Sequence, residues 1–325
     1  MRISPNRFFT AATVALLLSF SGLAGAQSYP SKPIRFIVPY APGGLPDTVA
    51  RVVAQKLQES VAQPVVIDNK PGGNGAVAAA AMATTPADGY TFLVTDGSMI
   101  TINPLIKKQL GYNPAKDFVP VSLIANSPLF LAVHPSVKAN SFDELMALAK
   151  SKPGAMNYGS SGIGSSHHLT AEAMKAGTGT VITHIPFKGS GASVPALIGG
   201  QVEMAFAAYP SLAGFVKSGQ VRILATNSLK RSSFAPNVPA ISEKIPGFDF
   251  AVNVIMMAET GTPADAVQKI SAEVAKIIKR KEVVESLHAA GIEPIGGGPD
   301  ALAKALHDES ARMAKAVKIA NVEPE

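Results

Sequence analysis

The sequence predicts an α/β protein of two lobes, with mainly parallel sheets and flanking helices. Short apolar runs such as residues 34–38, which are typical of buried strands, alternate with segments whose apolar residues recur at helical spacing. The 325 residues correspond to two domains at roughly 100–200 residues each. Because 47% of the residues are hydrophobic and 16% are charged, the composition excludes a disordered chain or a coiled coil.

Residues 1–26 resemble a secretory signal peptide. Two arginines precede an apolar run over residues 11–20, and Ala24-Gly25-Ala26 forms a small-residue cleavage site. The alternative is a membrane anchor, but the apolar run is shorter than the roughly 20 residues of a membrane span. We therefore expect cleavage after Ala26 and export of the mature chain to the periplasm.

Composition excludes several kinds of site. The absence of cysteine excludes disulfides, a thiol nucleophile, thiolate metal ligands and a lipid attached to cysteine. The six histidines show no metal-ligand spacing, so we expect neither a metal nor a cofactor. The net charge of +6 falls to +4 (6 − 2) without the two arginines of the signal. The one basic run, residues 276–281, ends a predicted helix, where cationic side chains complement the helix dipole. This position of the run and the expected export of the chain both argue against binding of nucleic acid.

The predicted elements follow in order along the chain. Short apolar runs predict strands at 34–38, 65–67, 91–94, 129–133, 181–185, 203–206 and 222–226. Apolar or small residues at helical spacing predict helices over 49–57, 76–83, 145–149, 169–174 and 267–277.

Two helix starts and two chain crossings complete this outline. Residues 141–144 match a capping box, and Thr262 is predicted to cap the last of these helices with Pro263 at its first position. Two lobes whose chain crosses near residues 126 and 250 fit the length, with residues 27–126 plus 250–325 in one lobe and 127–249 in the other.

One turn between a strand and a helix is suited to holding an anion. It contains Pro42, Gly43, Gly44 and Asp47. Its glycines allow a ligand close to the backbone, and the helix N-terminus that follows carries a partial positive charge. An ordinary tight turn accounts for the pattern equally well, and Asp47 is also placed to cap the helix.

A second loop is rich in serine and glycine and precedes another helix. It includes Ser160, Ser161, Gly164 and Ser165, whose hydroxyl and backbone N–H groups are suited to an anion. The loop is neither a Walker loop nor a complete Rossmann fingerprint. We count His168, which follows the loop, among the ligand-binding candidates. A structural hydrogen-bonding role fits it better than that of a catalytic base, because no nucleophile elbow accompanies it.

Two further strand ends complete the candidate site. A turn after one strand contains Phe187, Lys188 and Gly189, and Ala208 and Tyr209 follow another strand. Strand ends that face a crevice are where ligands bind in such sheets.

A series of motifs resembles Bug-type periplasmic solute-binding proteins of the tripartite tricarboxylate transporter class. The resemblance extends over essentially the whole mature chain. In order, the motifs are Tyr29-Pro30-Ser31-Lys32-Pro33-Ile34, Pro42-Gly43-Gly44 with Asp47, Ala50-Arg51, Asp88-Gly89-Tyr90, Ile102-Asn103-Pro104, Lys116-Asp117-Phe118, Asn157-Tyr158-Gly159-Ser160-Ser161-Gly162, Gly164-Ser165, His168-Leu169, Lys188-Gly189, Gly199-Gly200-Gln201-Val202 and Gly261-Thr262-Pro263.

The resemblance implies a type II periplasmic binding fold that closes on a small carboxylated solute in an interlobe cleft. It also implies a receptor, not an enzyme, that serves the membrane subunits of a tripartite tricarboxylate-type transporter as a monomer. The family's ligand-gripping loops correspond here to the first turn and the serine-glycine loop, and Ser98 matches a position that often faces the cleft.

The chain also departs from the family pattern. Ala207 and Ala208 replace an acid and an amide, and Asn253 and Glu259 stand where the family often has a tryptophan and a proline. We expect a distal pocket that is less acidic and roomier, which favours a di- or tricarboxylate or an aromatic carboxylate over an amino acid. Two alternatives remain: a sensor that presents its ligand to a signalling membrane protein, and a secreted serine hydrolase that uses His168.

Overall fold

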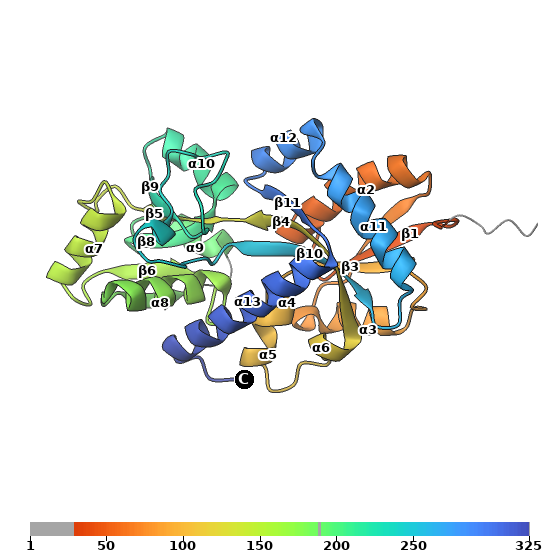
Figure 1. Cartoon of the computed structure of the whole chain (residues 1–325). Coiled ribbons are helices and arrows are strands. Elements are labelled where there is room, and N and C mark those ends of the chain that lie inside the picture. Colours follow the sequence, from red (N-terminus) through yellow and green to blue (C-terminus); the bar gives the residue numbers. More distant parts are fainter. Residues whose placement is uncertain (1–28, 188–189, 325) are drawn as a thin grey trace, which may run out of the picture.

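The computed structural model describes residues 29–187 and 190–324, which form two α/β lobes side by side (Figure 1). The described strands of the first lobe form a sheet in the order β11-β4-β10-β3-β1-β2. Their bounds are β1 (Ile34–Val38), β2 (Val65–Asn69), β3 (Thr91–Asp96), β4 (Phe118–Ser127), β10 (Val252–Glu259) and β11 (Glu293–Gly297). The sheet of the second lobe has the order β7-β6-β8-β5-β9. Its strands are β5 (Leu129–Val133), β6 (Asn157–Ser160), β7 (Thr183–Pro186), β8 (Met204–Ala208) and β9 (Arg222–Thr226).

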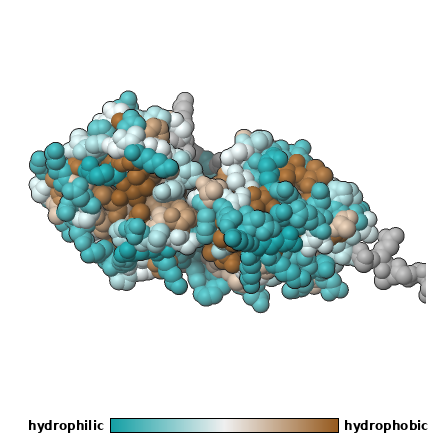
Figure 2. Space-filling model, turned by 90° about the horizontal axis from the view of Figure 1, so that it is seen from above, coloured by the Kyte–Doolittle hydropathy of each residue, from teal (hydrophilic) through white to brown (hydrophobic). Residues whose placement is uncertain are grey.

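Helices cover both sheets (Figure 1). They are α2 (Leu45–Val61), α3 (Ala76–Ala83), α4 (Ser98–Thr101), α5 (Asn103–Ile106), α6 (Pro114–Asp117), α7 (Phe142–Ser151), α8 (Ser166–Thr178), α9 (Ser190–Ile198), α10 (Tyr209–Lys217), α11 (Ala264–Ile277), α12 (Lys281–Ala289) and α13 (Pro299–Ile319). Within the described ranges, none of these helices has the length and apolar character needed to cross a membrane. Seen from above, hydrophilic residues cover most of the surface, and hydrophobic residues gather in patches on each lobe (Figure 2).

Every strand predicted from an apolar run is confirmed, but the two sheets are mixed instead of mainly parallel. β1 runs parallel to β2 and β3, and β6 runs parallel to β7 and β8. In contrast, β10 is antiparallel to β3 and β4, β11 is antiparallel to β4, and β5 is antiparallel to β8 and β9. Four of these five antiparallel pairs involve β5 or β10, the strands at which the chain enters the second lobe and returns to the first, so no crossover helix sets their direction.

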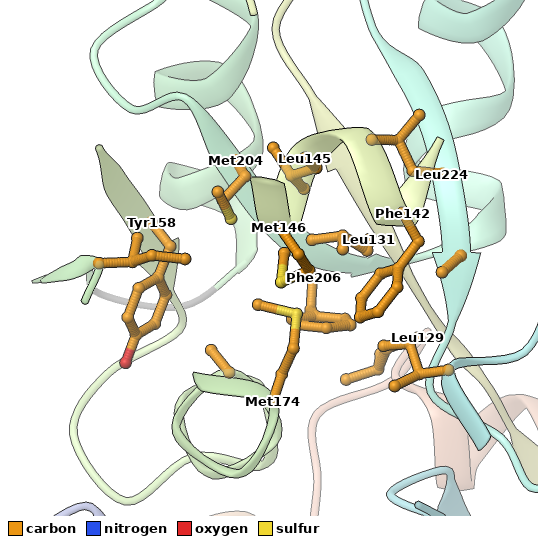
Figure 3. Close-up of a cluster of buried hydrophobic side chains, with 14 of the residues drawn as sticks. Leu129, Leu131, Phe142, Leu145, Met146, Tyr158, Met174, Met204, Phe206 and Leu224 are labelled. Atoms are coloured by element: carbon orange, nitrogen blue, oxygen red, sulfur yellow. The ribbon is translucent and has the colours of Figure 1, made fainter. Parts of the chain in front are cut away.

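The predicted apolar faces form the cores. In the second lobe, Leu131, Phe142 and Phe206 pack together with Met174 of α8 beneath the sheet (Figure 3). In the first lobe, α11 is buried against the sheet through Val267, Ile270, Val274 and Ile277. Burial of this kind stabilises a fold by about 25 cal/mol per Å² of apolar surface removed from water.

The two predicted helix starts have different outcomes. The Ser141 hydroxyl accepts the N–H of Glu144 at 3.1 Å, so the Ser141 half of the predicted capping box is confirmed. The Glu144 carboxylate accepts the N–H of Asn140 at 2.8 Å in place of that of Ser141. The predicted cap of α11 is wrong: Pro263 occupies the N-cap position and the helix begins at Ala264. The Thr262 hydroxyl instead donates to the carbonyl of Glu259 at 2.7 Å, because the chain makes a tight turn immediately before the helix.

The chain passes between the lobes where one core ends and the other begins. It leaves the first sheet at Ser127 and returns to it at Val252, and we propose these two passages as the hinge. The last helix, α13, lies along both lobes (Figure 1). Its Leu302 packs in the core of the first lobe, whereas its Met313 packs in the core of the second. The C-terminal half of this helix therefore contacts the second lobe, although the sequence placed all of residues 250–325 in the first.

Candidate functional site

Two adjoining cavities lie between the lobes. Their volumes are about 530 and 520 Å³. Both are lined by Tyr40, Asp96, Ser166 and Val252, so they are two halves of one cleft. Ser166 comes from the second lobe and the other three from the first. The cleft therefore meets the requirement that both lobes contact one ligand.

The first predicted turn lines the second cavity at the N-terminus of α2. Gly43 and Gly44 contribute to its wall, and the φ of +84° at Gly43 is a conformation that favours glycine. Gly44 is the N-cap residue, and no side chain caps the helix. Early N–H groups of a helix, such as that of Leu45, have no partner within the helix, and their partial positive charge favours an anion.

Asp47 maintains the shape of this turn and does not line either cavity. Its buried carboxylate accepts the N–H of Gly43 at 2.8 Å, the Nε–H of Arg51 at 2.8 Å and the Nδ2–H of Asn69 at 2.9 Å. Burial by itself would raise the pKa of Asp47, but these hydrogen bonds outweigh it and hold the pKa below its ordinary value. Pro42 is exposed and also lies outside the lining of both cavities.

The serine-glycine loop lines the first cavity at the N-terminus of α8. Ser161, Gly164 and Ser165 contribute to the wall. Ser165 caps the helix, because its hydroxyl accepts the N–H of His168 at 3.2 Å and donates to the carbonyl of Gly162 at 2.7 Å. The N–H groups of Ser166 and His167, the first two residues of the helix, have no partner within the helix. This is the second helix N-terminus that lines the cleft.

The same loop approaches the opposite lobe. Gly164 has a φ of +74°, and a Cβ atom there would lie 2.9 Å from Cδ1 of Ile106 in α5. The residue before it, Ile163, is 67% exposed and lines the first cavity. Glycine thus allows the two lobes to come close beside the cavity.

The histidines near this loop do not form a catalytic triad. The Ser161 hydroxyl lies 2.8 Å from Nδ1 of His167, which lines the second cavity. Burial lowers the pKa of His167 to about 4, so its ring is neutral at neutral pH. In the part of the chain that the structure describes, no carboxylate is hydrogen-bonded to His167 to orient it as a base.

Ser160 and His168 support the loop from behind. Nδ1 of His168 accepts the N–H of Gly164 at 3.1 Å, and its ring stacks on that of His184 with 4.0 Å between centroids. The Ser160 hydroxyl lies 2.6 Å from Nε2 of His184. Burial lowers the pKa of both histidines. Both predicted site residues are buried and lie outside the cavity walls.

The remaining predicted residues divide between the cleft wall and the interior. Ser98 lines the first cavity and Ala208 lines the second. Tyr209 packs on the ring of Phe130 with 5.3 Å between centroids, and the N–H of Phe187 donates to the Ser160 carbonyl at 3.1 Å. Neither of these side chains lines the cleft. Lys188 and Gly189 lie outside the described residues.

Several lining residues were not identified from the sequence. Tyr40 follows β1 closely and Asp96 ends β3, so the rule that ligands bind at strand ends could have identified both. Glu309 and Met313 reach the cleft from α13. No sequence pattern indicated them, because a regular amphipathic helix does not reveal which of its residues meets a neighbouring lobe.

The lining carries more hydrogen-bond donors than cationic side chains. Among the described residues of both walls, Lys107 is the one lysine and no arginine is present. Burial raises the pKa of Asp96 and of Glu309, and hydrogen bonds from Ser98 and Asn253 offset part of that effect. Across the described ranges, no cluster of histidine, aspartate and glutamate could hold a metal ion. The site is thus suited to binding an anion through N–H and O–H groups.

Comparison with known proteins places the chain in a family. Residues 49–322 match the family model described as the tripartite tricarboxylate transporter family receptor. The chain is 35% identical over 312 residues to the Bordetella pertussis protein BugT. The aligned region covers 94% of this chain and 96% of BugT.

Solved structures of relatives share the fold. The chain resembles an R. palustris protein solved with adipate, at 34% identity and a TM-score of 0.78, over 91% of this chain and all of the other. It also resembles MatC of Rhodopseudomonas palustris, solved with malate, at 27% identity and a TM-score of 0.71, over 89% of this chain and all of MatC. Transport receptors, not hydrolases, are therefore its relatives, and the chain belongs to the tripartite tricarboxylate transporter receptor family.

Proposed function

We propose that this protein captures a small carboxylate in the interlobe cleft and presents it to a membrane transporter of the tripartite tricarboxylate class. The observation that carries the proposal is that the N-termini of α2 and α8, from opposite lobes, line the same cleft. Relatives solved with adipate and with malate support a carboxylic acid as the ligand class. The protein acts in the periplasm as a monomer after removal of residues 1–26, which lie outside the described residues.

The cleft binds a carboxylate without an arginine. Two helix N-termini supply partial positive charge, and the early N–H groups of both helices supply the hydrogen-bond donors. We assign ligand contact to the lining members of the predicted site, which are Gly43, Gly44, Ser98, Ser161, Gly164, Ser165 and Ala208. We assign a positioning role to Asp47, Ser160 and His168, whose hydrogen bonds shape the two loops.

Closure follows from the position of the hinge. A ligand held by α2 and by α8 favours the state in which the two helix ends are nearest. The chain passes from β4 to β5 through Pro128 and returns to the first sheet at Val252, and one lobe turns against the other about these two points. The transporter recognises the closed conformation with its bound ligand.

Thermal unfolding with matched acid and amide pairs tests the proposal. We expect at least one of succinate, malate, adipate and benzoate to raise the melting temperature. Ligand at a hundredfold excess over Kd adds about 2.7 kcal/mol of stability. The corresponding amides have the same size but no charge, and we expect no shift from them. A shift that is equal for an acid and its amide, or no shift with any acid, would contradict carboxylate binding.

A further inference from the structure

We propose that the side chain of His167 contacts the ligand and donates a hydrogen bond from Nε2–H to the carboxylate held at the N-terminus of α2. This inference rests on the proposed capture of a carboxylate and adds a residue to that site. It assigns to the second lobe a side-chain donor for the group that the first lobe holds.

The position of His167 is the first step of the argument. It is the second residue of α8, and it lines the second cavity together with Gly43 and Gly44. These glycines precede α2 in the first lobe, and Gly44 is its N-cap residue. A carboxylate bound at the N-terminus of α2 therefore shares a cavity with an imidazole from the opposite lobe.

The hydrogen bonds of His167 leave one ring nitrogen available. Its Nδ1 lies 2.8 Å from the Ser161 hydroxyl. Among the described residues, none is hydrogen-bonded to Nε2, and Nε2 is not one of the buried atoms that lack a partner, so solvent in the cavity reaches it. A ligand that enters this half of the cleft meets an imidazole nitrogen that has no partner within the described part of the protein.

The imidazole is neutral, so the position of its one proton decides what Nε2 can do. Burial lowers the pKa of His167 to about 4, and no charged group of a described residue contributes to this shift. The Ser161 hydroxyl can either donate to Nδ1 or accept from it. An ionised carboxylate only accepts hydrogen bonds, so it favours the tautomer in which Ser161 donates to Nδ1 and Nε2 carries the proton.

This contact also favours closure of the cleft. A hydrogen bond to a charged group is stronger than one between neutral groups. Because His167 belongs to the second lobe and α2 to the first, the ligand can accept from both only when the lobes are close together. The bond therefore stabilises the closed state more than the open one.

Calorimetric titration of two matched variants tests this inference. The ligand is whichever of succinate, malate, adipate and benzoate binds the wild-type protein most tightly. His167→Gln keeps an N–H donor near the position of Nε2, whereas His167→Met has a side chain of similar length without a donor. We expect His167→Met to lose at least about fivefold in affinity, and His167→Gln to bind at least about threefold more tightly than His167→Met. His307→Met is the control, because His307 is exposed on α13 and lies outside both cavity walls, and we expect it to keep the wild-type affinity.

Nitrogen NMR of the histidine rings distinguishes ligand contact from a structural role. In the complex with the same acid at neutral pH, we expect the proton of His167 to lie on Nε2 and not on Nδ1. We also expect the Nε2 signal to move when the acid is added. The ring signals are assigned through the wild-type backbone, so this result is decisive even if both variants fail to fold.

The outcomes separate this inference from the proposed function. A proton on Nδ1 in the complex, or a smaller loss than that stated for a folded His167→Met protein, would overturn the role of His167 and leave carboxylate capture intact. Equal losses in His167→Gln and His167→Met would also overturn it, because the shape of the ring and not its N–H group would then be responsible. If none of the four acids binds the wild-type protein, both the inference and the carboxylate proposal fail for ligands of this size.

Discussion

Replacement of Gly44 by aspartate is expected to abolish carboxylate binding without destabilising the protein. Gly44 is the N-cap residue of α2, with φ −71° and ψ 167°, which an aspartate adopts without strain. An aspartate there accepts the N–H of Asp47 and places a permanent negative charge where the ligand carboxylate would bind. We expect an affinity loss of about a hundredfold or more, which corresponds to about 2.7 kcal/mol. The cap itself adds a few tenths of a kcal/mol to stability.

Calorimetry and thermal unfolding of two variants check this result. Gly44→Ala is the matched control, because the nearest atom to its Cβ would be the Ala41 carbonyl oxygen at 3.4 Å, an ordinary contact. Because Gly44→Ala adds a methyl group without a charge, we expect it to lose at least about tenfold less affinity than Gly44→Asp. Wild-type affinity in a folded Gly44→Asp protein would exclude the N-terminus of α2 from the binding site.

The second large effect is expected at Asp47. Asp47→Ala removes the acceptor for a backbone N–H, the Asn69 amide and the Arg51 guanidinium at once. We expect a loss of about 2–3 kcal/mol in the free energy of unfolding, because three hydrogen bonds to a buried charged group are lost together. Arg51→Ala is the contrast, since that side chain is 52% exposed and an exposed ion pair contributes less than about 1 kcal/mol. Urea denaturation of the three proteins measures both losses.

The stabilisation by Asp47 should depend on pH. The pKa of this group is lower in the folded protein than in the unfolded chain, so the unfolded chain binds the proton more readily. Its contribution is therefore present above the unfolded pKa of about 4 and is lost as pH falls below that value. The stability difference between wild type and Asp47→Ala should shrink as pH falls from 7 towards 3. A difference that stays constant over that range would mean that the carboxylate is not the source of the stability.

The sequence predicted the elements well where local pattern determines them. Residues 34–38, 129–133 and 222–226 are strands with the predicted bounds, since each is a short run that is buried on both faces. The sequence missed β4, β10 and β11, and it placed all of residues 250–325, which include α13, in one lobe. Which lobe a helix packs against depends on contacts between distant segments, and neither periodicity nor composition encodes these contacts.

The candidate site was predicted only in part, because its loops have a local pattern but the contacts of their side chains do not. Glycines and serines before a helix indicate an anion-binding loop, and both predicted loops line the cleft. The patterns do not reveal which way a side chain points, so Asp47 and His168 appeared to be ligand contacts although their hydrogen bonds shape the loops. Glu309 was not identified, because a single acid on a regular amphipathic helix has no pattern of its own.

Native mass spectrometry of the protein purified from its own periplasm tests the central claim most directly. Release of the bound molecule under denaturing conditions identifies it without any prior choice of ligand. We predict a small carboxylic acid, bound one to one, that is absent from Gly44→Asp prepared in the same way. A bound molecule without a carboxylate, or the same acid retained by Gly44→Asp, would contradict the claim that two helix N-termini hold a carboxylate between the lobes.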